Sequence, residues 1–128
     1  MSKELIYLAW TIAFTSVIWI PYILNMIMVR GLMDAVGYPD KPKPIAPWAQ
    51  RMQAAHYNAI ENLVVFAALV LIANHLGISN EATVMAAAIY FWTRVVHLIA
   101  YTFKIPWVRT LSFVVGFGCQ VTFILQIL

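Results

Sequence analysis

The chain has 128 residues, of which 63% are hydrophobic and only 10% are charged, and its mean hydropathy is +0.83. Ordinary soluble domains do not reach this apolarity, so the composition predicts an integral membrane protein. The net charge of +3 does not indicate nucleic-acid binding, because the basic residues lie at the ends of apolar runs and not in one patch. With Cys119 as the single cysteine, we expect neither a disulfide within the chain nor a metal site.

Four apolar runs divide the chain. A hydrocarbon core about 30 Å thick needs roughly 20 apolar residues per helix, so this length allows four spans and no soluble domain. We expect one all-α, four-helix membrane bundle over residues 1–128, and Pro21 predicts a kink in its first helix. The predicted spans are about 5–29, 48–75, 80–103 and 107–128.

The connections between the spans differ in length. Four prolines and one glycine between Asp34 and Pro47 predict an extended loop, which is either a substrate-access element or a spacer. Gly77 predicts the end of the second span, and Ser79 is a candidate N-cap for the third. Pro106 is suited to the first turn of the fourth span.

The distribution of basic residues predicts the topology. The first and third connections carry six basic residues, whereas the opposite side carries one, Lys3. The positive-inside rule therefore places both basic connections in the cytoplasm and both termini on the non-cytoplasmic side. The six basic residues of the first and third connections are Arg30, Lys41, Lys43, Arg51, Lys104 and Arg109.

The small size and the absence of tails favour a bacterial inner membrane over the endoplasmic reticulum.

A polar stripe follows the second span. Arg51, Asn58 and Glu61 share one helix face, because steps of seven and three residues nearly close on a repeat of about 3.6. An acid inside a membrane helix is costly unless it is paired. The stripe therefore predicts either a functional site or a structural contact between helices.

The third span carries a matching face. Arg94, His97 and Tyr101 are spaced three and four residues apart. At about 1.5 Å per residue, Asn58 and Arg94 lie at a similar depth from the basic end, with Glu61 one turn deeper. We therefore predict a structural ion pair between Glu61 and Arg94.

These residues predict a half-buried cavity, open on the basic side and lined by cations and hydrogen-bond donors. Such a cavity suits an anionic, partly polar ligand, with a lipid-soluble co-substrate entering from the bilayer. Arg109, in the first turn of the fourth span, would add its charge to the positive end of the helix dipole and stabilise a thiolate or a carboxylate.

Several motifs carry a resemblance to a known family. They are Arg51-x-x-Ala54-Ala55-x-x-Asn58-x-x-Glu61, Arg94-Val-Val-His97-Leu-Ile-Ala-Tyr101, Arg109-Thr110-Leu-Ser-Phe113 and Leu125-Gln-Ile-Leu128. Together they resemble the membrane-associated proteins in eicosanoid and glutathione metabolism, the MAPEG family. The pattern is most similar to the microsomal prostaglandin E synthase branch, and it covers all four spans.

The resemblance implies a homotrimer of four-helix protomers that holds glutathione between subunits near the cytoplasmic face. Arg109 matches the arginine that stabilises the glutathione thiolate, and Arg94 matches a structural arginine beneath the pocket. Arg51 belongs to the same basic cluster and is a further candidate ligand. The matched cofactor-binding positions are Arg30, Asn58, Glu61, His97, Tyr101 and Thr110.

Three positions differ from the family pattern. Ala54 stands where the family usually has a second arginine, and Tyr57 stands where the prostaglandin branch has another. Phe113 replaces a tyrosine of that branch. Each difference removes a polar contact to the ligand, and a charge-assisted contact is worth about 1.5 to 3 kcal/mol.

Three functions follow from these observations. The first is a glutathione-dependent transferase or peroxidase that acts on a hydrophobic electrophile in the membrane. The alternative is a non-catalytic membrane scaffold or lipid-binding accessory subunit with the same fold. The third is a small transporter in which Glu61 and His97 relay a proton or a substrate.

Overall fold

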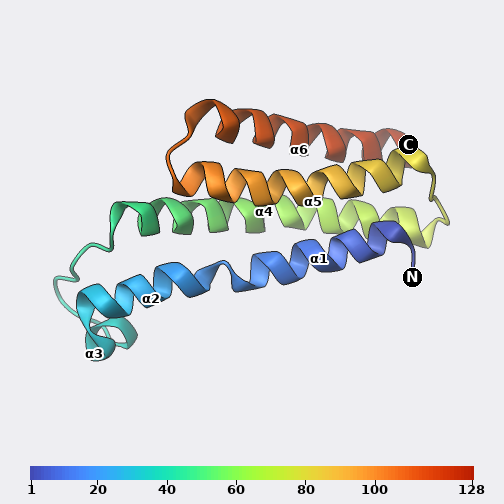
Figure 1. Ribbon diagram of the computed structural model, residues 1–128. Helices are drawn as coiled ribbons and strands as arrows, with labels where there is room; N and C mark the ends of the chain where they lie inside the picture. The colour runs from blue at the N-terminus through green and yellow to red at the C-terminus, as the bar shows by residue number, and fades with distance from the viewer.

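The computed structural model describes all 128 residues and contains six helices and no strand. Four helical segments are long and apolar enough to cross a membrane, and α1 and α2 together form the first of them. The predicted all-helical, four-helix membrane bundle is therefore confirmed (Figure 1). The helices are α1 (Lys3–Val17), α2 (Trp19–Arg30), α3 (Leu32–Val36), α4 (Pro47–His75), α5 (Glu81–Thr102) and α6 (Pro106–Ile127).

The first span is interrupted at Ile18, between α1 and α2. Pro21 explains the position of the break. A proline has no N–H to donate to the carbonyl four residues earlier, and its ring clashes with that carbonyl, which here belongs to Val17, the last residue of α1. The kink that Pro21 predicts therefore lies one turn before the proline itself.

Local sequence signals fix most of the other helix ends. Pro47 and Pro106 are the first residues of α4 and α6, where a missing N–H costs nothing. The N-cap of α5 is Asn80 and not Ser79, because Asn80 and Thr83 form a reciprocal capping box. The Ser79 hydroxyl instead donates to the Glu4 carboxylate at 2.9 Å.

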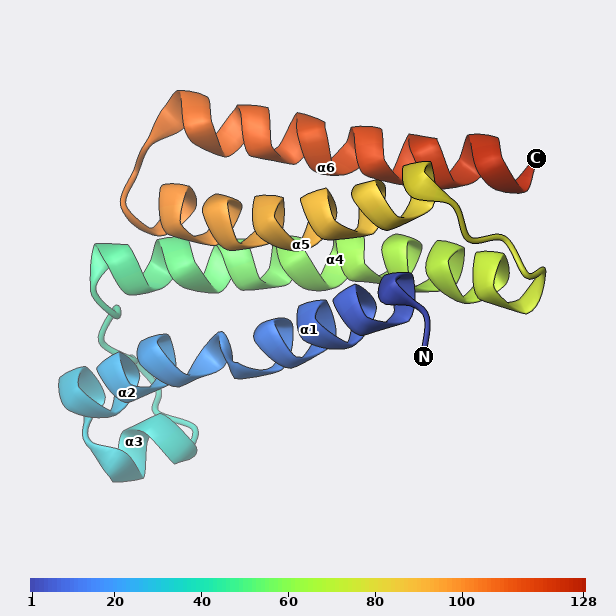
Figure 2. The same ribbon diagram turned by 45° about the vertical axis from the view of Figure 1, so that its right-hand side comes forward.

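The long connection is held against the end of α2. Its beginning is helical, since residues 32–36 form α3, and the proline-rich stretch follows without regular structure. Arg30 Nε donates to the Lys43 carbonyl at 2.7 Å, and the Ala46 N–H donates to Asn25 Oδ1 at 2.9 Å. These bonds place the basic loop at the end of the bundle that also carries the α5–α6 turn (Figure 2).

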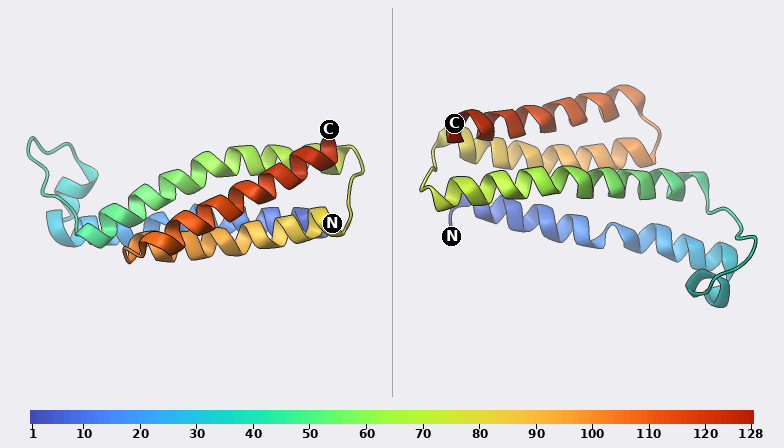
Figure 3. Two further views of the ribbon diagram at one scale, coloured as in Figure 1. Left: turned by 90° about the horizontal axis from the view of Figure 1, so that it is seen from above. Right: turned by 180° about the vertical axis from the view of Figure 1, so that it is seen from behind.

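The helices run alternately up and down, and α5 packs against α1, α4 and α6. The α1–α2 segment and α6 lie on opposite sides of the molecule, with α4 and α5 between them (Figures 1 and 3). Both termini lie at the end opposite the basic loop. We call the two ends the terminal end and the basic end.

The larger apolar cluster of the core lies in the half near the terminal end. There the rings of Phe66 and Tyr90 stack with centroids 3.8 Å apart, and Phe123 contacts Phe66 edge to face. The other half has a smaller apolar cluster between α2 and α4, beside a hydrogen bond between Tyr22 and His56. The space between α4, α5 and α6 in that half is lined by polar groups, so the fold leaves a polar interior at the basic end.

Candidate functional site

The polar face of α5 forms the centre of this interior. Arg94 and His97 are 4% and 3% exposed, so helix packing has removed both from the surface. Arg94 Nη2 lies 3.4 Å from His97 Nδ1, and the His97 ring packs edge-on against Tyr101 at 5.7 Å. The spacing of three and four residues thus produces one continuous column along α5.

Asn58 of α4 joins this column. Arg94 Nη2 donates to Asn58 Oδ1 at 2.7 Å, so the two residues occupy one layer, as the depth argument predicts. The network continues away from the basic end: Asn62 Nδ2 donates to the Asn58 carbonyl, and Gln120 Nε2 of α6 donates to the Asn62 carbonyl. Asn58 therefore supplies the amide acceptor for the buried guanidinium, and the amides of Asn62 and Gln120 extend the network to α6 through backbone carbonyls.

The predicted Glu61–Arg94 ion pair is not formed in the structure. Arg94 takes Asn58 as its partner, and the Glu61 side chain is exposed on the outer face of α4. The reason is rotation: three residues along a helix turn the side chain by about 300°, which leaves Glu61 about 60° away from the direction of Asn58. The sequence spacing predicted that Asn58 and Glu61 lie on one broad helix face, but it did not predict which of them binds Arg94.

Arg109 lies at the entrance to this site. Its guanidinium stands over the Tyr101 ring, 5.0 Å from the centroid, and its side chain makes no hydrogen bond within the protomer. A cavity of about 270 Å³ opens beside it. Five of the residues proposed for the site meet here, together with Phe113: the lining is Asn58, His97, Tyr101, Arg109, Thr110 and Phe113.

Arg51 reaches a neighbouring cavity. Its Nε donates to the Thr102 carbonyl at 2.9 Å, which anchors the side chain beside the end of α5. This second cavity, of about 260 Å³, shares Tyr101 and Arg109 with the first and adds Lys104. Three cations therefore line one small volume at the basic end.

Two proposed residues stay apart from the site within one protomer. Arg30 is held by the Lys43 carbonyl at the end of α2, on the side of α4 and α5 away from α6. Glu61 faces outward from α4. Neither lines the cavity that the other predicted residues share.

The structure also shows polar groups that the sequence reading did not single out. Asn62 lies four residues after Asn58 and could have been found from that spacing, whereas Gln120, in an otherwise apolar run, had no local signal. Glu4 is buried near the terminal end and accepts hydrogen bonds from Ser79 and Thr83.

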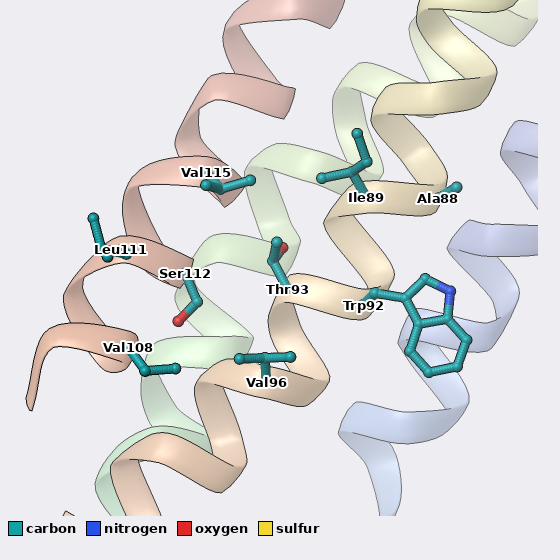
Figure 4. Close-up of a pocket in the computed structure, with 9 residues that line it drawn as sticks. All are labelled: Ala88, Ile89, Trp92, Thr93, Val96, Val108, Leu111, Ser112 and Val115. Atoms are coloured by element: carbon teal, nitrogen blue, oxygen red, sulfur yellow. The ribbon is translucent and has the colours of Figure 1, made fainter. Parts of the chain in front are cut away.

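An apolar groove runs between α5 and α6, on the surface that α4 does not cover. Figure 4 shows its lining, with the Trp92 ring directed toward α1 and the side chains of Val96 and Val108 near the basic end. The groove has a volume of about 430 Å³, and its lining is aliphatic apart from Trp92 and two hydroxyl residues, Thr93 and Ser112.

Comparison with known proteins identifies the class. The model of the MAPEG family matches residues 7–128, which is nearly the whole chain, and the protein therefore belongs to the MAPEG family. Proteins of this family generally use glutathione, and their roles are those of transferases, synthases or scaffolds. Neither the curated proteins nor the solved structures contain a match to this chain.

Proposed function

We propose that this protein is a membrane-embedded, glutathione-dependent transferase or peroxidase acting on a hydrophobic electrophile. The position of Arg109 carries the proposal. Its guanidinium stands over the Tyr101 ring and has no protein acceptor. It lies at the mouth of a cavity that is backed by buried polar groups. A cation placed in this way has charge available for an anionic ligand.

The residues present fit glutathione. The lining of the 270 Å³ cavity contains hydrogen-bond donors and no carboxylate, and behind it Arg94 Nε is buried without a partner. Bound glutathione would supply the sulfur nucleophile. Arg109, at the positive end of the α6 dipole, would favour the thiolate, while Asn58, His97 and Thr110 would orient the peptide.

One protomer supplies only part of such a site. Its cavity is slightly below the range of about 300–1,000 Å³ usual for ligand pockets. Glu61 lies 14 residues into α4, about 21 Å along a helix of roughly 43 Å, so its exposed carboxylate would meet the bilayer interior. A homotrimer that places the Glu61 face and Arg30 against a neighbouring copy would cover that charge and complete the pocket, as in the prostaglandin E synthase branch that the motifs resemble. Native mass spectrometry of the detergent-solubilised protein would report the subunit number.

The proposed role of Arg109 can be tested by comparing two ligands. We expect glutathione to bind the purified protein in calorimetry, and Arg109→Ala to weaken glutathione strongly but S-methylglutathione only slightly, because the methylated sulfur cannot ionise. Conjugation of glutathione to an aryl chloride should fall by about 10²–10³. Lys41→Ala, which removes a loop cation, is the control. Unchanged turnover in Arg109→Ala would refute the role.

A second candidate is a non-catalytic, lipid-binding scaffold. Two observations favour it: Phe113 puts an apolar ring into the site, and the groove between α5 and α6 offers about 430 Å³ of apolar volume. Stoichiometric lipid or protein co-purifying with the chain, without any thiol-dependent turnover, would support it. The transporter reading has less support, because Glu61 and His97 do not meet and the apolar core closes the terminal half.

We also propose that both termini are non-cytoplasmic and that the host is a bacterial inner membrane. The basic loop and the α5–α6 turn lie at one end of the bundle, so the positive-inside rule applies to both together. A Lys41→Cys variant should react with an impermeant maleimide only from the cytoplasmic side, since the native Cys119 is buried. Labelling from outside would reverse the topology.

A further inference from the structure

The cavity at the α5–α6 turn gathers more positive charge than the thiolate role of Arg109 requires. Its volume is about 260 Å³, and its lining includes Arg51, Lys104 and Arg109 but no acidic residue. Like charges that share a small volume repel one another, and a bound anion offsets that repulsion. The arrangement therefore suits an anionic ligand.

The three cations are available for binding. Arg51 uses Nε to hold the Thr102 carbonyl, which fixes the guanidinium and leaves its two terminal nitrogens without a protein acceptor. Arg109 is positioned by the Tyr101 ring and not by a carboxylate. No hydrogen bond to another residue occupies the Lys104 ammonium. The two arginines are thus already positioned by the fold, which lowers the cost of ordering them on binding.

Lys104 has an unfavourable backbone conformation for its residue type. Its φ is 61°, in the left-handed region, and it is the only residue other than glycine with a positive φ. The turn is a Schellman motif, in which Ile105 N bonds to the Ala100 carbonyl and Lys104 N to the Tyr101 carbonyl. Glycine is the usual residue at this position, so the lysine side chain occupies it at a cost in strain.

The start of α6 adds to the positive potential. The helix begins at Pro106 after Ile105, which supplies no side-chain cap, and both residues line the cavity. The N-terminal end of α6, which carries the positive end of the helix dipole, therefore lies beside the three cations.

We propose that Arg51, Lys104 and Arg109 form an anion-binding subsite for a phosphate monoester group. One carboxylate would be satisfied by a single bidentate arginine, whereas three converging cations and a helix N-terminus match a tetrahedral dianion. The group belongs either to a lipid headgroup such as phosphatidic acid or to a water-soluble phosphate ester. The subsite shares Tyr101 and Arg109 with the proposed glutathione cavity, but its response to phosphate can be measured without glutathione.

The test uses the full-length protein in nanodiscs of phosphatidylcholine, titrated with inorganic phosphate against chloride at matched ionic strength. We expect a saturable rise in the thermal midpoint for the wild type. Lys104→Gly and Arg51→Gln should each raise the apparent Kd about tenfold or more. Lys41→Gln, which removes a cation from the loop, should leave the Kd unchanged.

Lys104→Gly separates loss of binding from misfolding. Glycine suits the left-handed conformation, so this variant should be at least as stable as the wild type without phosphate while losing the phosphate-induced rise. The absence of a saturable rise in the wild type, or an equal rise in Lys104→Gly, would overturn the proposal.

Two further measurements assign the source of the group. If phosphatidic acid in the nanodisc abolishes the phosphate response, the subsite binds a lipid headgroup; if the response persists, it binds a soluble phosphate ester. Glutathione calorimetry on the same samples keeps the two proposals apart. Wild-type protein that binds phosphate but not glutathione would refute only the transferase.

Discussion

The helices α4 and α5 end at opposite ends of the bundle with the same pattern of backbone hydrogen bonds, but with different residues at the left-handed position. After α4, Gly77 N bonds to the Asn74 carbonyl and Ile78 N to the Ala73 carbonyl; after α5, Lys104 and Ile105 make the equivalent bonds. The left-handed position has φ 71° at Gly77 and φ 61° at Lys104. At the terminal end, Gly77 is the residue type that this backbone conformation favours. At the basic end, Lys104 adopts the same conformation with strain, and the Lys104 side chain lines a cavity.

The same contrast holds for buried charge. At the terminal end the Glu4 carboxylate accepts hydrogen bonds from Ser79 and Thr83 and is fully enclosed. At the basic end Arg94 is buried with one amide partner and an unpartnered Nε, and Arg109 is exposed with no acceptor at all. The buried carboxylate at the terminal end is therefore hydrogen-bonded within the protomer, whereas the arginines of the basic end keep donors that no protein group accepts.

The largest expected effect is on the amide that holds Arg94. Asn58→Leu would leave a buried guanidinium without its Oδ1 acceptor, and we expect it to lower the free energy of unfolding by about 3 kcal/mol. Asn74→Leu, the same change at an exposed position of α4, should cost less than about 0.5 kcal/mol. Titration with sodium dodecyl sulfate in mixed micelles measures both, and equal losses would show that Asn58 does not support the buried charge.

A slightly smaller effect is expected at the terminal end. Glu4→Ala would remove the acceptor of the Ser79 hydroxyl and one of the two acceptors of the Thr83 hydroxyl, and should destabilise the protein by roughly 2 kcal/mol. Glu81→Ala removes an exposed acid of the α5 first turn, and its cost should stay below about 1 kcal/mol. The same titration applies. A loss at Glu81 as large as that at Glu4 would argue for a general charge effect instead of the buried contact.

Exchanging the two turn residues tests the strain directly. Lys104→Gly should stabilise the protein by about 0.5–1 kcal/mol, because a left-handed lysine costs about 1–2 kcal/mol and the greater freedom of glycine in the unfolded chain offsets part of the gain. Gly77→Lys should destabilise it by a similar amount. If both variants moved stability in the same direction, the comparison between the two turns would fail.

The smallest effect concerns the thiol site. Phe113→Tyr would add a hydroxyl to the cavity lining and should tighten glutathione binding by roughly 0.5 kcal/mol, about twofold, as measured by calorimetry. Phe117→Tyr, one turn further along α6 and outside the cavity, is the matched control. Equal changes in both variants would remove Phe113 from the site.

Features that depend on neighbouring residues could be predicted from the sequence. Apolar runs gave the four long helices, Pro47 and Pro106 marked helix starts, and the spacing of Arg94, His97 and Tyr101 gave their shared column. The reason is that helix periodicity and proline chemistry act over a few residues. The Asn80–Thr83 capping box is equally local, and Ser79 was the wrong choice only because two candidate caps are adjacent.

Features that depend on how the helices pack came only from the tertiary structure. The rotation of α4 against α5 decided that Arg94 binds Asn58 and that Glu61 points outward, although both lie on one sequence stripe. The position of α6 brought Arg109 over Tyr101 and Gln120 to Asn62. The sequence by itself determined a four-span MAPEG-like bundle and the polar faces of its helices. Packing angles decided which of those polar groups are satisfied, because a hydrogen bond depends on distances of a few ångströms between helices that the chain order does not encode.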